Sequence, residues 1–286
     1  MPPSTTPTLR QQRLGAELRK LRERAGLTTI AAASLLGVNQ SRISSIEGGR
    51  YAVSADRVRT MARNYSCTQP ELVDALAEMT GGRTRGWWDE YREMLPVGLM
   101  DLAELEHHAR AVRVAVALHM PGLLQIVDHT RATLGATEPP LLPHEVEHLS
   151  SYRIKRQAIL HRDRPTRYTA IIHETALRLR VGGPATARRQ LEHLIRMSEY
   201  DHITVLVIPF GEAGFTPSGQ PITYAHGPLP QLDTLVLDTD HGCEFLDAQA
   251  RLEIYRKVLD RLEASALRPE ETRDLIHRIA QGDRKD

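Results

Sequence analysis

The sequence predicts an α-helical N-terminal domain followed by a larger α+β C-terminal domain with one small sheet. Apolar residues recur at helical spacing through residues 9–79. Residues 80–86 are rich in glycine, which predicts a linker. Beyond the linker, short runs of β-branched residues alternate with amphipathic segments, a mixture that is typical of α+β domains.

The composition is that of a globular chain. Apolar residues make up 41% of the 286 residues. With the 19 glycines added, the total is close to the apolar share that is usual in soluble globular domains, which excludes wholesale disorder. The longest apolar run, Val205–Phe210, is too short for a membrane helix, and the first residues lack the apolar stretch of a signal peptide. Cys67 and Cys243 suggest neither a disulfide framework nor a zinc knuckle. We therefore expect a cytoplasmic protein.

The N-terminal domain is predicted at residues 9–79, after a Pro/Ser/Thr-rich arm at 1–8 that we expect to be disordered. Its five helices are expected at about residues 9–25, 29–36, 39–48, 54–65 and 70–79. Ser54 is a good N-cap for the fourth helix. Thr68 and Glu71 have the spacing of a capping box for the fifth helix.

The C-terminal domain is predicted at residues 87–286. Its helices are expected at about residues 99–119, 122–134, 143–162, 174–180, 185–200, 247–266 and 269–281. Its strands are expected at residues 167–173, 202–209, 221–226, 234–238 and 243–246.

The charges are divided unevenly between the two domains. Residues 1–66 contain eleven Arg and Lys against four Asp and Glu, a net charge of +7, so the remaining residues carry −6 of the total of +1. A basic domain attached to an acidic one indicates that the basic domain meets a polyanion.

Residues 29–48 have the pattern of a helix-turn-helix, in which the second helix enters the major groove of DNA. Ala33 is the small residue required where the helices approach, and Gly37 lies in the turn. Ile43 and Ile46 would hold the second helix from its buried side. The residues left facing outward are Gln40, Ser41, Arg42, Ser44 and Ser45.

These outward residues are of the types that contact DNA. Glutamine can pair with adenine, serine can bond to several bases, and arginine can bind guanine or phosphate. We assign DNA contacts to nine residues: Thr28, Thr29, Asn39, Gln40, Ser41, Arg42, Ser44, Ser45 and Arg50. Whether Gln40 contacts a base or a phosphate is left open.

The pattern from Leu27 to Arg50 resembles the XRE (lambda repressor/Cro-like) helix-turn-helix family, over about residues 9–66. The resemblance implies a sequence-specific DNA-binding transcriptional regulator. The family often has glutamine where Thr29 stands. The phosphate contact that this glutamine makes in the family would therefore be weakened here, or made by the Thr29 hydroxyl instead. The alternative is a five-helix bundle that never touches DNA, with residues 47–50 as an ordinary helix exit.

Five short motifs follow one another in the C-terminal domain. They are Met120-Pro-Gly-Leu-Leu-Gln125, Arg153-x-x-Arg156-Gln157, His173-Glu-Thr-Ala-Leu177, Arg189-Gln-Leu191 and Val207-Ile-Pro-Phe210. The series resembles, over about residues 85–282, the C-terminal domain of unknown function of actinobacterial XRE regulators. Some of these are toxin–antitoxin-like and are encoded beside a small partner protein. Each motif also has a packing interpretation. For the arginine motif, it is that Arg153 and Arg156 anchor Glu174 in a polar core.

A competing hypothesis comes from His144-Glu-Val-Glu-His148, which matches the zinc-peptidase pattern H-E-x-x-H. Glu147 stands where such helices are usually apolar, and nearby prolines place the motif in a first helical turn. No clear third ligand follows, although His173 or Glu174 could be proposed. A solvated helix face with two histidines is the interpretation that we favour, and we interpret His107 and His108 as surface residues.

The sequence thus predicts a DNA-binding transcriptional regulator with no catalytic residues, no metal site and no cofactor. Its expected partners are double-stranded DNA, a second copy of the chain in a homodimer, and a small protein encoded nearby. The alternatives are a DNA-tethered zinc peptidase, and a protein-interaction module whose N-terminal domain is incidental.

Overall fold

The computed structural model describes residues 6–80, 86–212, 220–239 and 242–282. The chain divides into two compact units, Met1–Asp89 and Glu90–Asp286, which we call the head and the body. Most of the predicted arm, residues 1–5, and most of the predicted linker, residues 81–85, lie outside the described residues.

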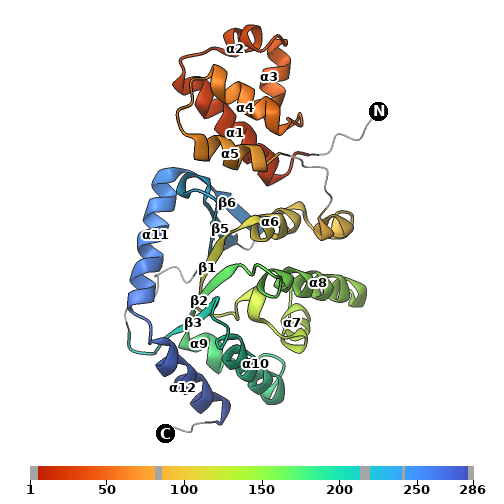
Figure 1. Cartoon of the computed structure of the whole chain (residues 1–286). Coiled ribbons are helices and arrows are strands. Elements are labelled where there is room, and N and C mark those ends of the chain that lie inside the picture. Colours follow the sequence, from red (N-terminus) through yellow and green to blue (C-terminus); the bar gives the residue numbers. More distant parts are fainter. Residues whose placement is uncertain (1–5, 81–85, 213–219, 240–241, 283–286) are drawn as a thin grey trace. The chain divides into compact units, whose positions relative to one another are not determined.

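The described part of the head is α-helical, as predicted (Figure 1). Its helices are α1 (Leu9–Arg24), α2 (Thr29–Leu35), α3 (Gln40–Glu47), α4 (Ala55–Asn64) and α5 (Pro70–Glu78). Their apolar faces meet in one core, where Leu18, Ile43 and Met61 are fully buried. Burial of these faces, rather than helix propensity, stabilises such short helices.

The helix caps of the head confirm one prediction and correct another. The Ser54 hydroxyl accepts a hydrogen bond from the Arg57 backbone N–H at 3.3 Å and caps α4, as predicted. The predicted capping box of Thr68 and Glu71 is wrong, because α5 begins at Pro70 after Gln69, which makes no side-chain cap. Proline at the first helical position has no N–H to satisfy, so the helix can begin there without a capping side chain.

The strands described in the body form a single six-stranded sheet, in the order β3-β2-β1-β4-β5-β6. They are β1 (Ala111–Val116), β2 (Arg167–His173), β3 (Ile203–Ile208), β4 (Ile222–His226), β5 (Thr234–Thr239) and β6 (Gly242–Leu246). β1, β2 and β3 run parallel, and β4 pairs antiparallel with both β1 and β5. The sheet confirms the α+β prediction for this unit.

Helices cover both faces of the sheet (Figure 1). The body helices are α6 (Val97–His108), α7 (Val127–Leu134), α8 (Pro143–Arg156), α9 (Glu174–Arg178), α10 (Pro184–Met197), α11 (Gln249–Ala264) and α12 (Pro269–Ala280). Short 3-10 helices are η1 (Trp87–Tyr91, which spans the unit boundary), η2 (Gly122–Leu124), η3 (Gln157–Leu160) and η4 (Pro230–Leu232). One face packs against α10 and α12 through Val205, Leu194 and Ile276, whereas the other packs against α11 through Leu252 and Leu259.

The central strand β1 corrects the prediction of one long helix at 99–119. The helix α6 ends at His108, and Ala111–Val116 pairs with β2 on one side and β4 on the other. Val112, Val114 and Val116 alternate with intervening residues and lie in the core of one sheet face. The short side chain of Ala115 is buried on the other face, so the alternation is only partly visible in the sequence.

The geometry of the arginine motif differs from the predicted one. Arg156 binds Glu106 of α6 through two hydrogen bonds, of 2.8 and 2.6 Å, and both side chains are largely buried. Glu174 instead accepts hydrogen bonds from Arg178, four residues on, and from the Phe210 backbone N–H. The predicted anchoring of Glu174 by Arg153 and Arg156 is therefore wrong.

Among the described residues, no helix combines the length and the apolar character needed to cross a membrane.

The buried histidine of α7 generates a prediction about pH. His129 is 4% exposed, and burial, followed by the charge of Arg153, lowers its pKa from 6.5 to about 4. As pH falls below 6.5, the unfolded chain binds a proton at this position before the folded chain does. Stability is therefore lost between about pH 6.5 and pH 4, with a loss of about 2 kcal/mol expected from this group by pH 5.

Urea unfolding of the wild-type chain and of His129→Phe, at pH 7 and pH 5, measures this contribution. We expect the variant to lose less stability on acidification by about that amount. An identical loss in both proteins would show that His129 is already accessible to protons in the folded chain.

Candidate DNA-binding surface

The helices α1 and α3 approach each other closely at a glycine. A Cβ atom built on Gly15 of α1 would lie 2.5 Å from the carbonyl oxygen of Glu47 and 2.6 Å from that of Ile46. Both oxygens belong to α3 and its end, so a larger residue at position 15 would push the two helices apart. This contact sets how far α3 stands from the core of the head.

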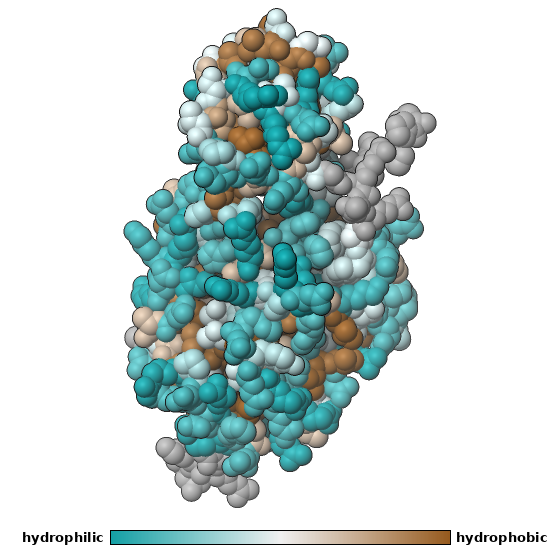
Figure 2. All heavy atoms as spheres, viewed as in Figure 1, coloured by the Kyte–Doolittle hydropathy of each residue, from teal (hydrophilic) through white to brown (hydrophobic). Residues whose placement is uncertain are grey.

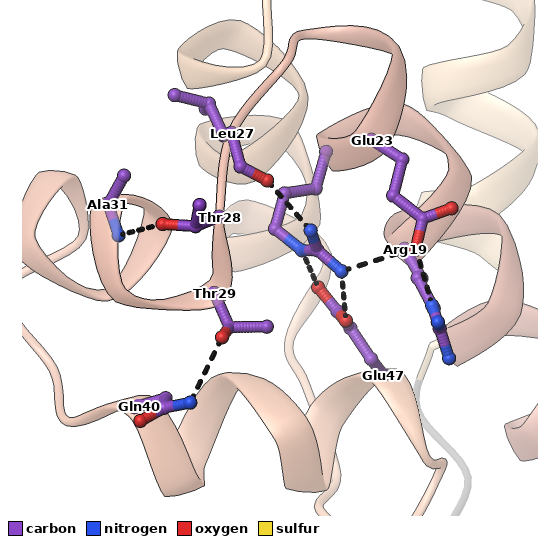
Figure 3. Close-up of polar contacts among 9 residues, drawn as sticks. Arg19, Glu23, Leu27, Thr28, Thr29, Ala31, Gln40 and Glu47 are labelled. Atoms are coloured by element: carbon purple, nitrogen blue, oxygen red, sulfur yellow. Dashed lines mark hydrogen bonds and ion pairs between the residues drawn. The ribbon is translucent and has the colours of Figure 1, made fainter.

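A buried ion pair joins the same two helices (Figure 3). The Arg22 Nε and Nη2 atoms donate to the two carboxylate oxygens of Glu47, at 2.6 and 2.9 Å. The third donor, Nη1, reaches the carbonyl oxygen of Leu27, which precedes α2, at 2.7 Å. The side chains of Arg22 and Glu47 are 7% and 6% exposed, and the bond to Glu47 raises the pKa of Arg22. One guanidinium thereby ties together α1, α3 and the chain entering α2.

The turn between α2 and α3 is fixed by glycine geometry and by α4. Gly37 has φ of +63°, a left-handed conformation that glycine adopts without strain. The Arg57 Nη2 atom of α4 donates to the Leu36 carbonyl oxygen at 2.8 Å. Ala33 and Ile43 are buried between the helices, as the helix-turn-helix pattern predicts.

The nine residues assigned to DNA contact lie on α3, at its ends, and at the start of α2. Seven of them are exposed and two, Thr29 and Ser45, are half-buried. Gln40, Ser41 and Ser44 share one exposed face of α3, because residues three and four apart lie on the same side of a helix. Ile43 and Ile46 occupy the opposite, buried face.

Two of the nine residues cap the helices. The Thr28 hydroxyl accepts from the Ala31 backbone N–H at 3.1 Å, and the Asn39 side chain accepts from the Arg42 backbone N–H at 2.9 Å. Asn39 also accepts from the Ser41 hydroxyl at 2.9 Å. The caps fix the N-termini of both helices, where backbone N–H groups are suited to phosphate.

Thr29 and Gln40 contact each other directly (Figure 3). The Gln40 Nε2 atom donates to the Thr29 hydroxyl oxygen at 3.1 Å. Thr29 therefore restricts the rotamer of Gln40 and turns one amide hydrogen toward α2, while the Gln40 carbonyl oxygen keeps its acceptor capacity.

The two arginines of the assigned set lie away from the Gln40 face. The Arg42 guanidinium stacks on the Tyr51 ring, with its central carbon 3.4 Å from the ring centroid. Arg50 lies at the exit of α3, where its guanidinium approaches Gly48. These positions flank the helix and suit contact with the DNA backbone better than with base edges.

The outer side of α2 is apolar. Figure 2 shows hydrophobic side chains gathered at the end of the head where α2 lies, and Ile30 and Leu35 are 65% and 56% exposed. Such side chains make no hydrogen bonds to phosphate. The polar contacts that α2 can offer to DNA are therefore concentrated at its N-terminus, with Thr28 and Thr29.

Residues that position α3 were missed by sequence reasoning. Arg22, Arg57 and Gly15 are distant in sequence from the residues that they hold, and no local pattern marks these pairings. Tyr51, on which Arg42 stacks, was missed as well. It is 41% exposed and directly follows Arg50, and this adjacency to an assigned residue is the signal that could have identified it.

The zinc-peptidase pattern gains no support from the geometry. His144 is exposed in the first turn of α8, and the two histidine rings lie edge to face, 6.0 Å apart. Glu145 accepts from the Leu142 backbone N–H and so caps the helix, while Glu147 binds Arg131. Within the described ranges, no group of three His, Cys, Asp or Glu side chains is arranged to hold a metal ion.

Comparisons with known families cover most of both units. Residues 13–76 match a family described as a helix-turn-helix domain. Residues 99–278 match a family described as a domain of unknown function (DUF5753). No curated protein matches the chain, and no solved structure matches it.

The buried ion pair of the head generates a prediction about stability. Glu47→Gln leaves the buried Arg22 charge with only the half-exposed carboxylate of Glu23, 3.6 Å away, and we expect a loss of about 3 kcal/mol. The double variant Arg22→Met, Glu47→Leu removes both charges and should recover most of this loss. It should remain slightly less stable than the wild type, because the hydrogen bond from Arg22 to the Leu27 carbonyl oxygen is also lost.

Calorimetry of the full chain follows the unfolding transition of the head. Arg59→Met is the matched control, because its ion pair with Asp74 is solvent-exposed and shares no partner with Arg22. A double variant no more stable than Glu47→Gln would contradict the role given to the pair.

Proposed function

The chain belongs to the family of the domain of unknown function DUF5753 and carries a helix-turn-helix domain, and from this premise we propose that it is a sequence-specific DNA-binding transcriptional regulator of XRE type. In this proposal the head recognises the operator. The body joins two copies of the chain and senses a ligand or a partner protein.

The observation that carries the proposal is the exposed polar face of α3. Gln40, Ser41 and Ser44 have side chains that bond to base edges, and they project from a helix whose other face is buried. The ion pair of Arg22 with Glu47 and the close contact at Gly15 hold this helix in place. A reading helix must be rigid, because base contacts tolerate little displacement.

Electrostatics support the same assignment. The net charge of +7 on residues 1–66 attracts the phosphate backbone, whereas the remaining residues carry −6. Arg42 and Arg50 at the flanks of α3, with Thr28 and Asn39 at the helix N-termini, would contact phosphates. Gln40 would contact a base, and its amide would be held by the hydroxyl of Thr29. Thr29 stands where the XRE family often has glutamine.

We further propose a DNA-binding domain at residues 9–79, a linker at 80–86 and a regulatory, partner-binding domain at 87–286. The acidic body would add no phosphate contacts, so its contribution to affinity would come from joining two heads in a homodimer. The likeness to actinobacterial toxin–antitoxin-like regulators supports a small protein encoded nearby as a partner of the body. We place this regulator in the cytoplasm.

Gln40 tests base recognition. The preferred site is first selected from random duplexes with the full chain. Gln40→Ala should then lose about 1–3 kcal/mol of affinity for that site and little for unrelated DNA. Gln69→Ala, an exposed glutamine before α5, is the matched control and should bind as the wild type does.

Titrations by fluorescence anisotropy at several salt concentrations separate the possible roles. Wild-type binding should weaken steeply as salt increases, since phosphate contacts release counter-ions. An equal loss of affinity on selected and unrelated DNA would make Gln40 a phosphate contact, and salt-independent binding would contradict the proposal as a whole.

The spacing of half-sites tests the homodimer. Two joined heads can occupy successive major grooves on one side of the duplex only when the half-site centres lie about 34 Å apart, or a multiple of this. Adding about half a helical turn between the half-sites should therefore abolish most of the gain from pairing. Equal affinity at every spacing in a footprinting series would show that each chain binds independently, and would contradict the homodimer.

A further inference from the structure

Two arginines one helical turn apart on α8 have opposite surroundings. Arg156 is neutralised by Glu106, which it binds through two hydrogen bonds. Arg153 makes one hydrogen bond, from Nη1 to the Gln125 Oε1 atom at 3.1 Å, and none of the described carboxylates forms an ion pair with it. A guanidinium has five N–H donors, so most of its donors are not used within the described chain.

The missing counter-ion is costly because the surroundings of Arg153 are poorly hydrated. Burial, followed by repulsion from Arg156, lowers the pKa of Arg153 to about 10. The charge of Asp238, at the end of β5, raises the pKa of Arg153, but the two side chains form no ion pair. A desolvated cation destabilises a folded chain unless an anion offsets its charge. Arg153 nevertheless remains only half-buried, so a solute can reach it.

The groups beside Arg153 are fixed and polar. Gln125 is 6% exposed; its Nε2 atom donates to the Met120 carbonyl oxygen at 2.8 Å, and its Oε1 atom also accepts from the Thr130 hydroxyl at 3.1 Å. The carbonyl oxygen of Gln125 accepts from the Gln157 side chain at 2.7 Å. Gln125 is thus a positioning residue that holds Arg153 in one orientation.

His129 adds a second unused polar group. It is 4% exposed, and its Nδ1 atom has no hydrogen-bond partner. His129 lies on α7, which packs against α8, and the next residue, Thr130, donates to the same Gln125 Oε1 atom as Arg153. Burial, with the Arg153 charge second, lowers the pKa of His129 and keeps the imidazole neutral at pH 7. A neutral imidazole can donate one N–H to an anion. Buried polar atoms without a partner are uncommon in folded proteins and require an explanation.

The segment that holds Gln125 leaves one edge of the sheet. Gln125 follows the loop that leaves the carboxyl end of β1, and the end of β5 lies at the same edge, because β4 pairs antiparallel with both strands. β1 is a central strand of the sheet, with β2 on one side and β4 on the other. The segment that holds Gln125 therefore begins at the middle of this edge of the sheet.

We propose that Arg153 and His129, positioned by Gln125, bind the anionic group of a small molecule, a carboxylate or a phosphate. Arg153 supplies paired N–H donors to two anion oxygens, and His129 supplies a third donor. This site would make the body a sensor of small anionic metabolites. Only the link from anion to DNA affinity rests on the proposed function; anion binding itself does not.

The test measures the unfolding temperature of the full chain with millimolar inorganic phosphate or citrate, at an ionic strength kept constant with chloride. A ligand that binds only the folded chain raises this temperature in proportion to its occupancy. We expect a saturable rise with one of the two anions, and the anion that produces it identifies the group as phosphate or carboxylate. No rise with either anion, or equal rises with both and without saturation, would overturn the proposal.

Substitutions connect the effect to the site. Arg153→Met should abolish the rise and should leave the anion-free chain at least as stable as the wild type, since it removes an uncompensated cation. Arg153→Lys keeps the charge but not the two-pronged geometry, and should bind the anion several-fold more weakly. Arg164→Gln, at an exposed arginine of the body, is the control and should respond as the wild type does.

A purely structural role predicts a different outcome. If Arg153 served only to hold Gln125, Arg153→Met would lower the unfolding temperature of the anion-free chain, and Arg153→Met and wild type would respond to the anions alike. No DNA is present in these measurements, so their failure would leave the proposed DNA binding untouched. The reverse also holds, because a chain that binds no DNA could still bind the anion.

Discussion

The ion pair between Arg22 and Glu47 is the constraint on which the geometry of the head depends. It connects the end of α1 to the end of α3, and its remaining donor holds the chain that enters α2. Both charges are almost fully buried, so neither can leave its partner without a large cost. The orientation of α3 relative to α2 is therefore set from behind, by residues that contact no DNA. The exposed face of α3 is left free to vary in sequence without loss of the fold.

The body uses arginine in two ways. Arg156 and Glu106 repeat the solution found in the head, a buried pair that joins two helices, here α8 and α6. Arg153 lies on the same helix without a counter-ion, and the neighbouring helix α7 carries His129, whose Nδ1 atom has no partner. Proteins retain such unfavourable groups mainly at functional sites, where a ligand offsets their cost. The contrast between the two arginines is the reason to regard this part of the body as a binding site.

Sequence reasoning located what depends on neighbouring residues. The turn at Gly37, the buried face of Ile43 and Ile46, and the five strands after residue 166 each have a local pattern, and the structure confirms them. It failed where the determining contact is distant. Arg22 and Glu47 are separated by 25 positions and Glu106 and Arg156 by 50, so no spacing rule connects them. β1 was missed because it follows α6 after only two residues and is buried on both faces, which hides its alternation.

The most direct test of base recognition by α3 is to identify which residues of the head contact bases. A photoreactive group is attached at Ser44→Cys in a chain whose two native cysteines are replaced by serine, and at Thr68→Cys, an exposed position between α4 and α5, as a control. We predict cross-links from position 44 to bases at a few defined positions of the selected DNA site, and none from position 68. Cross-links from position 68 alone, or from position 44 spread evenly along the duplex, would contradict it.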